Sequence, residues 1–282
     1  MAGPENRVPD ALFRDPPTDA AAPAQTLPQA IPSYGVNLNA VLYTAAGAGP
    51  HPTILLLHGL PGNKQNVDLA QAMRRAGWNV LIIHYGGSWG GPGTFSFAHC
   101  LEDAASALDW LRSADGDCAS RVNPRRIVVI GHSMGGFVAA HLLAEQPDVL
   151  GAGLISGVDL GRSFGNADKR LAVAEIDENV GSSAGLHILA GTSPLVLTEE
   201  ARANAERWSL RNYAAQIAGR PLLMATSDDG FAADSDALAN ALGQPSSHVQ
   251  RQHFSTDHSY SDQRIGLQTF VLGWLATHYP GA

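Results

Sequence analysis

The sequence predicts an α/β protein, with a mostly parallel, doubly wound sheet that helices cover on both faces. Two observations support this fold class. Short apolar runs such as residues 53–57 and 126–130 are continuous rather than alternating, as in strands that are buried on both faces. Segments of helical length separate the runs, which is typical of crossover connections between parallel strands. The chain has 282 residues, 45% of them apolar, so we expect one large core and a single main domain.

The predicted elements follow one another in a regular order. Residues 36–43 alternate between apolar and polar, which indicates a half-exposed antiparallel strand at the edge of the sheet. The elements expected after it are strand 53–57, helix 67–76, strand 79–85, helix 97–113, strand 126–130, helix 135–145, strand 152–156, strand 221–225, helix 234–242, strand 248–254 and helix 262–278. Such an order brings the loops that follow the parallel strands to one edge of the sheet, where open α/β sheets bind ligands.

Two segments fall outside this alternation. Residues 1–32 contain seven prolines and many alanines, so we expect a poorly structured leader followed by a folded domain over residues 33–282. Residues 158–220 contain no clear strand but two helical stretches, 199–208 and 210–217. This segment predicts a small, mainly helical cap inserted into the domain.

The charge and hydropathy of the chain exclude two classes of partner. The formal net charge is -8, and the Lys and Arg residues are scattered rather than gathered in a basic stripe, so we expect no nucleic-acid partner. No apolar run approaches the roughly 20 residues that a membrane-spanning helix needs, so we expect a soluble protein with no membrane partner. We also expect no signal peptide in this chain, because no basic segment precedes an apolar one at the N-terminus. The compartment, cytoplasmic or exported as a mature form, stays open, as does the oligomeric state.

The two cysteines, Cys100 and Cys118, do not form a metal-binding motif. They are 18 residues apart, no C-x-x-C pair is present, and two thiols without a nearby pair of histidines make no zinc site. We therefore expect no metal. Residue 100 falls in a predicted helix, so we expect free thiols, although the spacing leaves a disulfide between them open.

The pattern Gly-x-Ser-x-Gly occurs four times, centred on Ser88, Ser133, Ser163 and Ser183. With 30 glycines in the chain, the pattern alone does not identify a nucleophile. A nucleophilic serine of this type needs a sharp turn between a buried strand and a helix, whose N-terminus faces the developing negative charge. Only Ser133 follows a β-branched strand, 126–130, and leads directly into a predicted helix. The sequence therefore predicts Ser133 as the nucleophile.

The other three serines lack this context. Ser88 is followed by the Gly-Pro-Gly sequence at 91–93, where no helix can begin. Ser183 lies in the polar insertion. Ser163 is the strongest rival because a strand precedes it, but the intervening residues would not make a sharp turn.

Two glycine-rich segments carry a resemblance to a known family. Residues 131–136 read Gly-His-Ser-Met-Gly-Gly, and residues 58–62 read His-Gly-Leu-Pro-Gly at the end of an upstream strand. Together they resemble the α/β-hydrolase superfamily, over about residues 36–278. The resemblance implies that the backbone N–H groups of Leu60 and Met134 form the oxyanion hole. For the first residue of the upstream segment, His58, we expect a role in bracing the loop rather than in proton transfer.

A base and an acid are expected after the nucleophile, in that family's chain order of serine, acid and histidine. His253 falls inside a predicted strand, whereas His258 lies in a polar loop before the last helix, so we predict His258 as the base. Its loop resembles the histidine loop of prolyl-oligopeptidase-like members of the superfamily. The acid should end the preceding strand, where Asp228 and Asp229 are neighbours. Spacing does not separate them, and the resemblance implies the second, Asp229.

A glycine-rich loop around Trp89 follows another predicted strand. Residues 86–93 contain five glycines and follow the carboxyl end of the strand. This is the edge of the sheet at which the fold binds its ligands. We therefore expect Trp89 to contribute to the substrate pocket.

These groups together predict a serine hydrolase. Attack by a serine, proton transfer by a histidine and an oxyanion hole serve acyl transfer to water, and no cofactor is required. We expect cleavage of a small acyl ester through an acyl-enzyme, as in carboxylesterases and dienelactone-hydrolase-like proteins. A single-domain peptidase resembling acylaminoacyl peptidases is the alternative, although the chain has no room for the propeller domain of those enzymes. A non-catalytic binding protein on the same fold is the third hypothesis.

Overall fold

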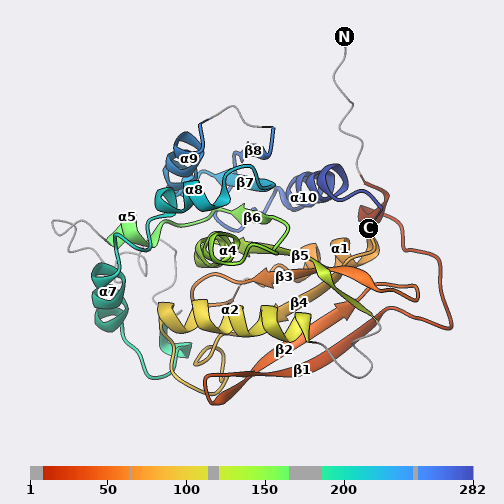
Figure 1. Ribbon diagram of the computed structural model, residues 1–282, viewed down its shortest axis with the longest axis horizontal. Coiled ribbons are helices and arrows are strands. Elements are labelled where there is room, and N and C mark those ends of the chain that lie inside the picture. Colours follow the sequence, from red (N-terminus) through yellow and green to blue (C-terminus); the bar gives the residue numbers. More distant parts are fainter. Residues whose placement is uncertain (1–8, 64, 114–120, 165–185, 244–246, 282) are drawn as a thin grey trace, which may run out of the picture.

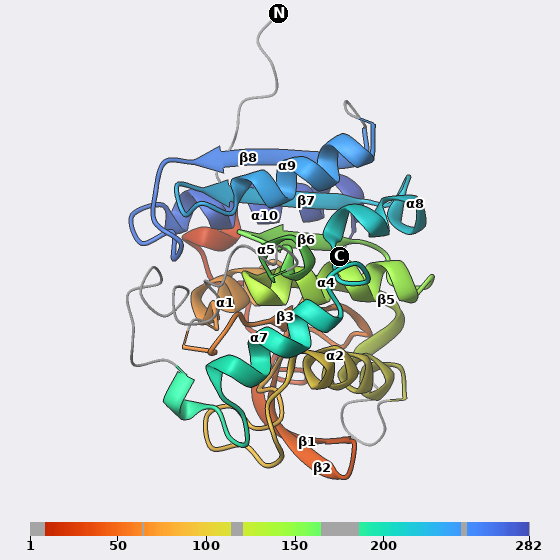
Figure 2. The same cartoon turned by 90° about the vertical axis from the view of Figure 1, so that its left-hand side faces the viewer.

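One eight-stranded sheet forms the centre of the molecule. The computed structural model describes residues 9–63, 65–113, 121–164, 186–243 and 247–281, and within these ranges the strand order is β1-β2-β4-β3-β5-β6-β7-β8 (Figure 1). The strands are Gln25–Ser33 (β1), Val36–Thr44 (β2), His51–Leu57 (β3), Asn79–Ile83 (β4), Val122–His132 (β5), Ala152–Ile155 (β6), Leu222–Ser227 (β7) and Val249–Phe254 (β8). β2 pairs antiparallel with both of its neighbours, β1 and β4. All the other pairings in the sheet, from β4 to β8, are parallel. The predicted mostly parallel sheet is thereby confirmed, and Figure 2 shows its strands one above another.

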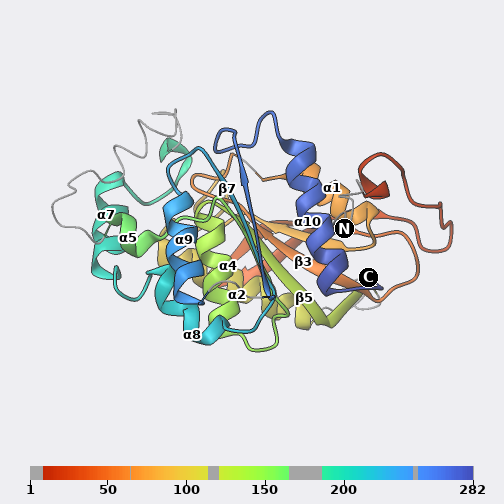
Figure 3. The same cartoon turned by 90° about the horizontal axis from the view of Figure 1, so that it is seen from above.

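Helices cover both faces of this sheet. The α-helices are Val67–Arg75 (α1), Phe97–Arg112 (α2), Met134–Glu145 (α4), Leu160–Phe164 (α5), Pro194–Ala203 (α7), Ala214–Ile217 (α8), Ala232–Ala241 (α9) and Arg264–His278 (α10). Short 3-10 turns lie at Asp10–Leu12 (η1), Leu186–Ile188 (η2) and Leu210–Tyr213 (η3). Figure 3 shows α1 and α10 on one side of the strands and α4, α8 and α9 on the other.

The alternation of side chains along the central strands divides the core into two clusters. In β3, Leu55 and Leu57 join the cluster that includes α2 and α4, whereas Ile54 and Leu56 join the cluster that includes α1 and α10. All four side chains are essentially inaccessible to solvent. Both faces of a central strand are therefore covered, which is why its sequence is apolar without alternation.

Strand β1 lies partly inside the segment that we expected to be poorly structured. That expectation is wrong for residues 25–32, which pair with β2 along their whole length. β1 is the edge of the sheet, where alternate N–H groups face away from any neighbour, so Pro28 and Pro32 are tolerated. Ile31 is completely buried, and burial of such a side chain contributes about 1.5–3 kcal/mol, which anchors the strand.

The described part of the 158–220 insertion is helical or irregular and contains no strand. α7 begins earlier than expected for 199–208, because the side-chain oxygen of Ser193 accepts a hydrogen bond from the N–H of Val196 and Pro194 occupies the first helical turn. Residues 210–217 form η3 and α8.

Cys100 is a free, buried thiol on α2, whereas Cys118 lies outside the described residues. Among the residues described, no helix combines the length and apolar character needed to span a membrane. The same residues include no cluster of three or more His, Cys, Asp or Glu side chains arranged to hold a metal ion.

Candidate active site

Ser133 occupies a strained turn between the end of β5 and the start of α4. Its φ of 58° and ψ of -122° lie outside the regions that a residue with a side chain prefers. Three backbone hydrogen bonds hold it there: its N–H donates to the carbonyl of Ile155 at 2.8 Å, and its carbonyl accepts from Gly136 at 2.9 Å and Val158 at 3.2 Å. The surrounding backbone therefore fixes the conformation of Ser133.

The glycines of this turn are required by backbone contacts. A Cβ on Gly131 would lie 1.8 Å from the carbonyl oxygen of Gly135, and one on Gly135 would lie 2.3 Å from the carbonyl oxygen of Leu57. A Cβ on Gly59 would lie 2.8 Å from the Cβ of Ser133 and 3.3 Å from its Oγ. No side chain fits at Gly131 or Gly135, and the loop after β3 passes directly against Ser133.

The structure separates Ser133 from the other matches to the motif. Ser88 is completely buried, and its hydroxyl donates to the carbonyl of Tyr85 at 2.7 Å. Ser163 lies within α5, where its N–H donates to the carbonyl of Asp159 at 2.9 Å, and not on a turn after a strand. Ser183 lies outside the described residues.

His258 and Asp229 meet through a short hydrogen bond. The distance from His258 Nδ1 to Asp229 Oδ2 is 2.8 Å, and the Asp229 side chain is only 3% exposed. The Ser227 hydroxyl donates to Asp229 Oδ2 at 2.8 Å, and the Phe231 N–H donates to Oδ1 at 2.9 Å. Burial by itself would raise the pKa of Asp229, but hydrogen bonds, that from His258 first, outweigh it and hold the pKa well below its ordinary value. Asp229 is therefore an ionised carboxylate that orients the imidazole.

The neighbouring residues Asp228 and His253 form a separate pair at the surface. Asp228 Oδ1 lies 3.0 Å from His253 Nε2, and these side chains are 61% and 47% exposed. Nδ1 of His253 lies 3.0 Å from the hydroxyl of Thr226, on the adjacent strand. Asp228 thus pairs with His253, whereas Asp229 is the carboxylate that is hydrogen-bonded to His258.

The loop between β8 and α10 carries His258 to the end of β5. Nε2 of His132 lies 2.8 Å from the carbonyl oxygen of His258, and the centroids of the two rings are 4.6 Å apart. His132 directly precedes Ser133 in the chain. The loop of the predicted base therefore packs against the residue that precedes the predicted nucleophile.

His58 braces the loop that passes against Ser133, as expected. Its Nδ1–H donates to the carbonyl of Gly59 at 2.8 Å, and its ring packs edge-on to Tyr85 at 4.6 Å. Burial lowers the pKa of His58 to about 4, so the ring is neutral at pH 7. Leu60 follows Gly59, which lies against Ser133, and Met134 follows Ser133 directly.

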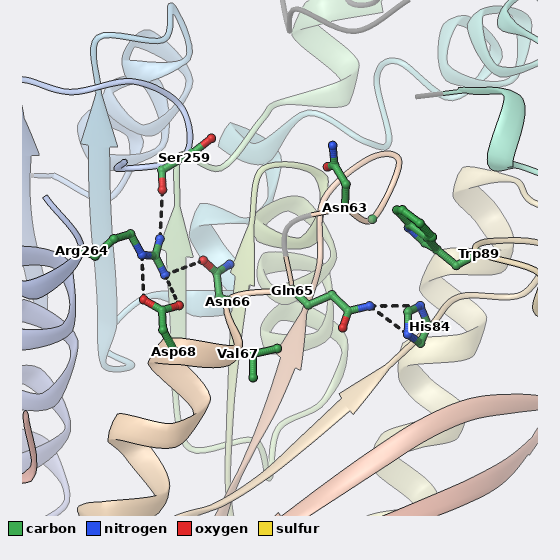
Figure 4. Close-up of a pocket in the computed structure, with 10 residues that line it drawn as sticks. Asn63, Gln65, Asn66, Val67, Asp68, His84, Trp89, Ser259 and Arg264 are labelled. Carbon is green, nitrogen blue, oxygen red and sulfur yellow. Dashed lines mark hydrogen bonds and ion pairs between the residues drawn. The ribbon is translucent and has the colours of Figure 1, made fainter. Parts of the chain in front are cut away.

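Trp89 lines a pocket, as Figure 4 shows. The pocket has a volume of about 510 Å³, and its wall includes Trp89, Gly62 and Ser259. The indole is 47% exposed, and a Cβ on Gly62 would lie 2.8 Å from its Nε1. Ser259 follows His258 directly, so the pocket adjoins the loop of the predicted base.

Sequence reasoning missed a junction centred on Arg264. Its guanidinium donates to the carbonyl of Ser259 at 3.0 Å, to Asn66 Oδ1 at 3.0 Å, and to both oxygens of Asp68 at 2.6 and 2.8 Å (Figure 4). The junction ties the histidine loop to the start of α1. No local motif could have indicated it, because Arg264 and Asp68 are 196 residues apart.

Comparison with known sequences finds partial matches. A profile of the alpha/beta hydrolase fold family matches residues 52–180. An uncharacterized protein of Mycobacterium tuberculosis (strain H37Rv) is 32% identical over 114 residues, which are 40% of this chain and 39% of that protein. The lysophosphatidylserine lipase ABHD12 of Rattus norvegicus is 34% identical over 104 residues, 36% of this chain and 24% of that protein. The chain thus matches well under half the length of these curated relatives.

Solved structures match over almost the whole chain. The acylaminoacyl peptidase of Pyrococcus horikoshii has a TM-score of 0.68 at 17% identity, covering 92% of this chain and 43% of that one. The carboxylesterase EstE1, cloned from a metagenomic library, has a TM-score of 0.66 at 19% identity, covering 97% of this chain and 94% of that one. The chain therefore has the α/β-hydrolase fold and resembles the esterases and peptidases that share it.

Proposed function

We propose that this protein is a serine hydrolase that cleaves a small acyl ester through an acyl-enzyme intermediate. The observation that carries the proposal is the strained turn of Ser133, whose preceding residue, His132, contacts the loop of His258, while His258 itself is hydrogen-bonded to Asp229. A serine held on such a turn, with a base that a buried carboxylate orients, is the arrangement that activates a hydroxyl for attack on a carbonyl.

The reaction follows from the roles of these groups. The Oγ of Ser133 attacks the ester carbonyl while Nε2 of His258 takes its proton, and Asp229 stabilises the imidazolium that forms. The N–H groups of Leu60 and Met134 donate to the oxyanion, and loss of one such donor typically costs about 3–4 kcal/mol of transition-state stabilisation. His258 then gives the proton to the leaving alcohol, and a water molecule repeats the sequence to release the acid. No cofactor takes part in these steps.

Peptidase activity is the second candidate. The fold likeness to the acylaminoacyl peptidase and the resemblance of the histidine loop favour it. This chain covers only 43% of that peptidase, however, so the match gives no information about properties that depend on the rest of the peptidase. Kinetics on p-nitrophenyl esters beside N-acyl-aminoacyl anilides separate the two, and a higher kcat/KM for the anilides would assign the protein to the peptidases.

Labelling by a fluorophosphonate probe tests the proposal most directly, because only an activated serine reacts. We expect the wild-type protein and the Ser163→Ala variant to be labelled and the Ser133→Ala variant to remain unlabelled. An unlabelled wild-type protein that is folded by circular dichroism would favour the non-catalytic binding protein instead.

A further inference from the structure

The lining of the pocket in Figure 4 includes residues close in the chain to His258 and to the loop that packs against Ser133. One wall contains Ser259, the residue after His258. Another contains Gly62, three residues after Gly59, whose backbone packs against Ser133. Three residues of extended chain span at most about 11 Å, so a group held in this pocket is within reach of an ester bond at Ser133.

The lining of the pocket carries no net charge. Its acid and its base, Asp68 and Arg264, neutralise each other through a two-pronged ion pair of 2.6 and 2.8 Å. Nε2 of Gln65 lies 2.8 Å from Nε2 of His84, and burial lowers the pKa of His84, so this ring accepts the hydrogen bond in its neutral form. The charged groups in this lining are already paired with each other, so the lining does not favour a charged ligand.

Two apolar side chains remain open at the pocket. Trp89 is 47% exposed and Val67 is 40% exposed, although both are large hydrophobic residues. The Trp89 indole packs against the backbone of Gly62, which also adjoins the buried ring of His58: a Cβ on Gly62 would be 2.8 Å from each ring. The pocket thus presents an aromatic surface and the apolar side chain of Val67, with the polar side chains of Asn63 and Ser259 also in its lining.

We propose that this pocket binds the leaving alcohol of the ester, and that the preferred alcohol is neutral and aromatic. The inference rests on the proposed function, since it uses the path of the proton. His258 must reach the leaving oxygen to protonate it, so the alcohol departs on the side of His258, and the next residue, Ser259, lines the pocket. The acyl group stays on Ser133 and does not enter this pocket. An aromatic ring fits because offset or edge-on contact with the Trp89 indole adds to burial of its surface.

The test varies the alcohol and the acyl group separately. The alcohol series is phenyl acetate and 2-naphthyl acetate against methyl acetate and ethyl acetate, and the acyl series is p-nitrophenyl acetate, butyrate and hexanoate. Each is measured with the wild type, Trp89→Ala, Trp89→Phe and the control Phe13→Ala, which removes an exposed aromatic ring outside the pocket lining.

We expect Trp89→Ala to lower kcat/KM about tenfold more for the aryl acetates than for the alkyl acetates, in line with the energy of an aromatic pair. Trp89→Phe should restore most of the loss, and Phe13→Ala should change neither series. Across the acyl series, the ratio of wild type to Trp89→Ala should stay constant.

Two results would overturn the inference. An equal loss for aryl and alkyl acetates would show that Trp89 does not contact the alcohol, and a ratio that changes with acyl length would place the acyl group in the pocket. Both require a protein that the fluorophosphonate probe labels at Ser133. Absence of labelling and of all ester hydrolysis would instead refute the proposed function itself.

Discussion

The two halves of the candidate site are built in different ways. The Ser133 half is contiguous in sequence and is held by backbone contacts that leave no space for side chains at Gly131 and Gly135. The His258 half joins distant segments through side-chain hydrogen bonds, with Asp229 on one side and Arg264 on the other. A substitution that disturbs the backbone-built turn should destabilise the whole protein. Loss of one side-chain hydrogen bond in the other half should leave the protein folded. Substitutions in the two halves should therefore differ in whether they affect stability or activity.

Ser133→Ala should lower kcat for a small activated ester by about 10⁶, the scale observed when a catalytic serine is removed. Unfolding by urea should be unchanged, because the substitution removes only the hydroxyl and the backbone contacts remain. Stopped assays with p-nitrophenyl acetate measure the first quantity and the urea midpoint the second. Activity near that of the wild type would refute the choice of nucleophile.

Asp229→Asn should lower kcat by about 10⁴, because the amide favours the wrong tautomer of His258. Asp228→Asn is the matched control, since it makes the same change at a side chain that is 61% exposed and pairs with His253 instead. We expect it to retain most of the activity. Steady-state kinetics on both variants decide the point, and a larger loss in the control would reverse the assignment.

Gly135→Ala should destabilise the protein by at least about 4 kcal/mol, because its Cβ would lie 2.3 Å from the backbone carbonyl of Leu57. Gly273→Ala offers a control within α10, where nothing lies within 4 Å of the new Cβ. Alanine favours the helix, so the control should gain about 0.5–1 kcal/mol. Urea titration gives both values, and a mild effect at residue 135 would contradict the account of a backbone-built turn.

Asp234, in the first turn of α9, should make stability depend on pH. Burial, together with the nearby Asp159 carboxylate, raises the pKa of Asp234 to about 6. Because the pKa is higher in the folded protein than in the unfolded chain, protonation of Asp234 stabilises the fold. This contribution is complete below about pH 4 and is lost above about pH 6. The free energy of unfolding should fall by roughly 3 kcal/mol or less across that window.

The Asp234→Asn variant should lack this decline, because an amide does not titrate. Asp236→Asn serves as its control on the same helix, since Asp236 is exposed and forms a surface pair with Arg251. Urea titrations at pH 4, 5, 6 and 7 give the slopes. Parallel curves for the wild type and Asp234→Asn would exclude Asp234 as the source.

Arg264→Gln should have the smallest effect, a loss of roughly tenfold in kcat/KM, because the histidine loop loses its tie to α1 and a small displacement of the base slows the reaction. The ion pair is partly exposed, so the free energy of unfolding should change by less than about 1 kcal/mol. Arg251→Gln breaks a comparable surface pair elsewhere and should leave kcat/KM unchanged. Unchanged kinetics for Arg264→Gln would mean that the loop does not depend on this junction.

The sequence by itself determined the alternating strands and helices and the position of Ser133. Both depend on patterns that are contiguous in the chain: uninterrupted apolar strands, and glycines where strand and helix meet. Such patterns are visible because the residues that form them are only a few positions apart, even where the steric requirement comes from a distant segment, as that at Gly135 comes from Leu57. Reliance on such local patterns also explains why residues 25–32 were wrongly expected to be poorly structured. Prolines indicate irregular structure unless they lie on an edge strand, and Pro28 and Pro32 lie on the edge strand β1.

Only the tertiary structure decided how the other half of the site is assembled. Asp228 and Asp229 are identical and adjacent, so no local pattern separates them, yet one is exposed and the other is buried against His258. The junction of Arg264 with Asp68 joins positions 196 residues apart, and the pocket beside Trp89 requires the three segments 62–68, 84–89 and 259–264 to meet. The physical reason is that burial and side-chain hydrogen bonds are properties of neighbours in space, which the order of residues along the chain does not reveal.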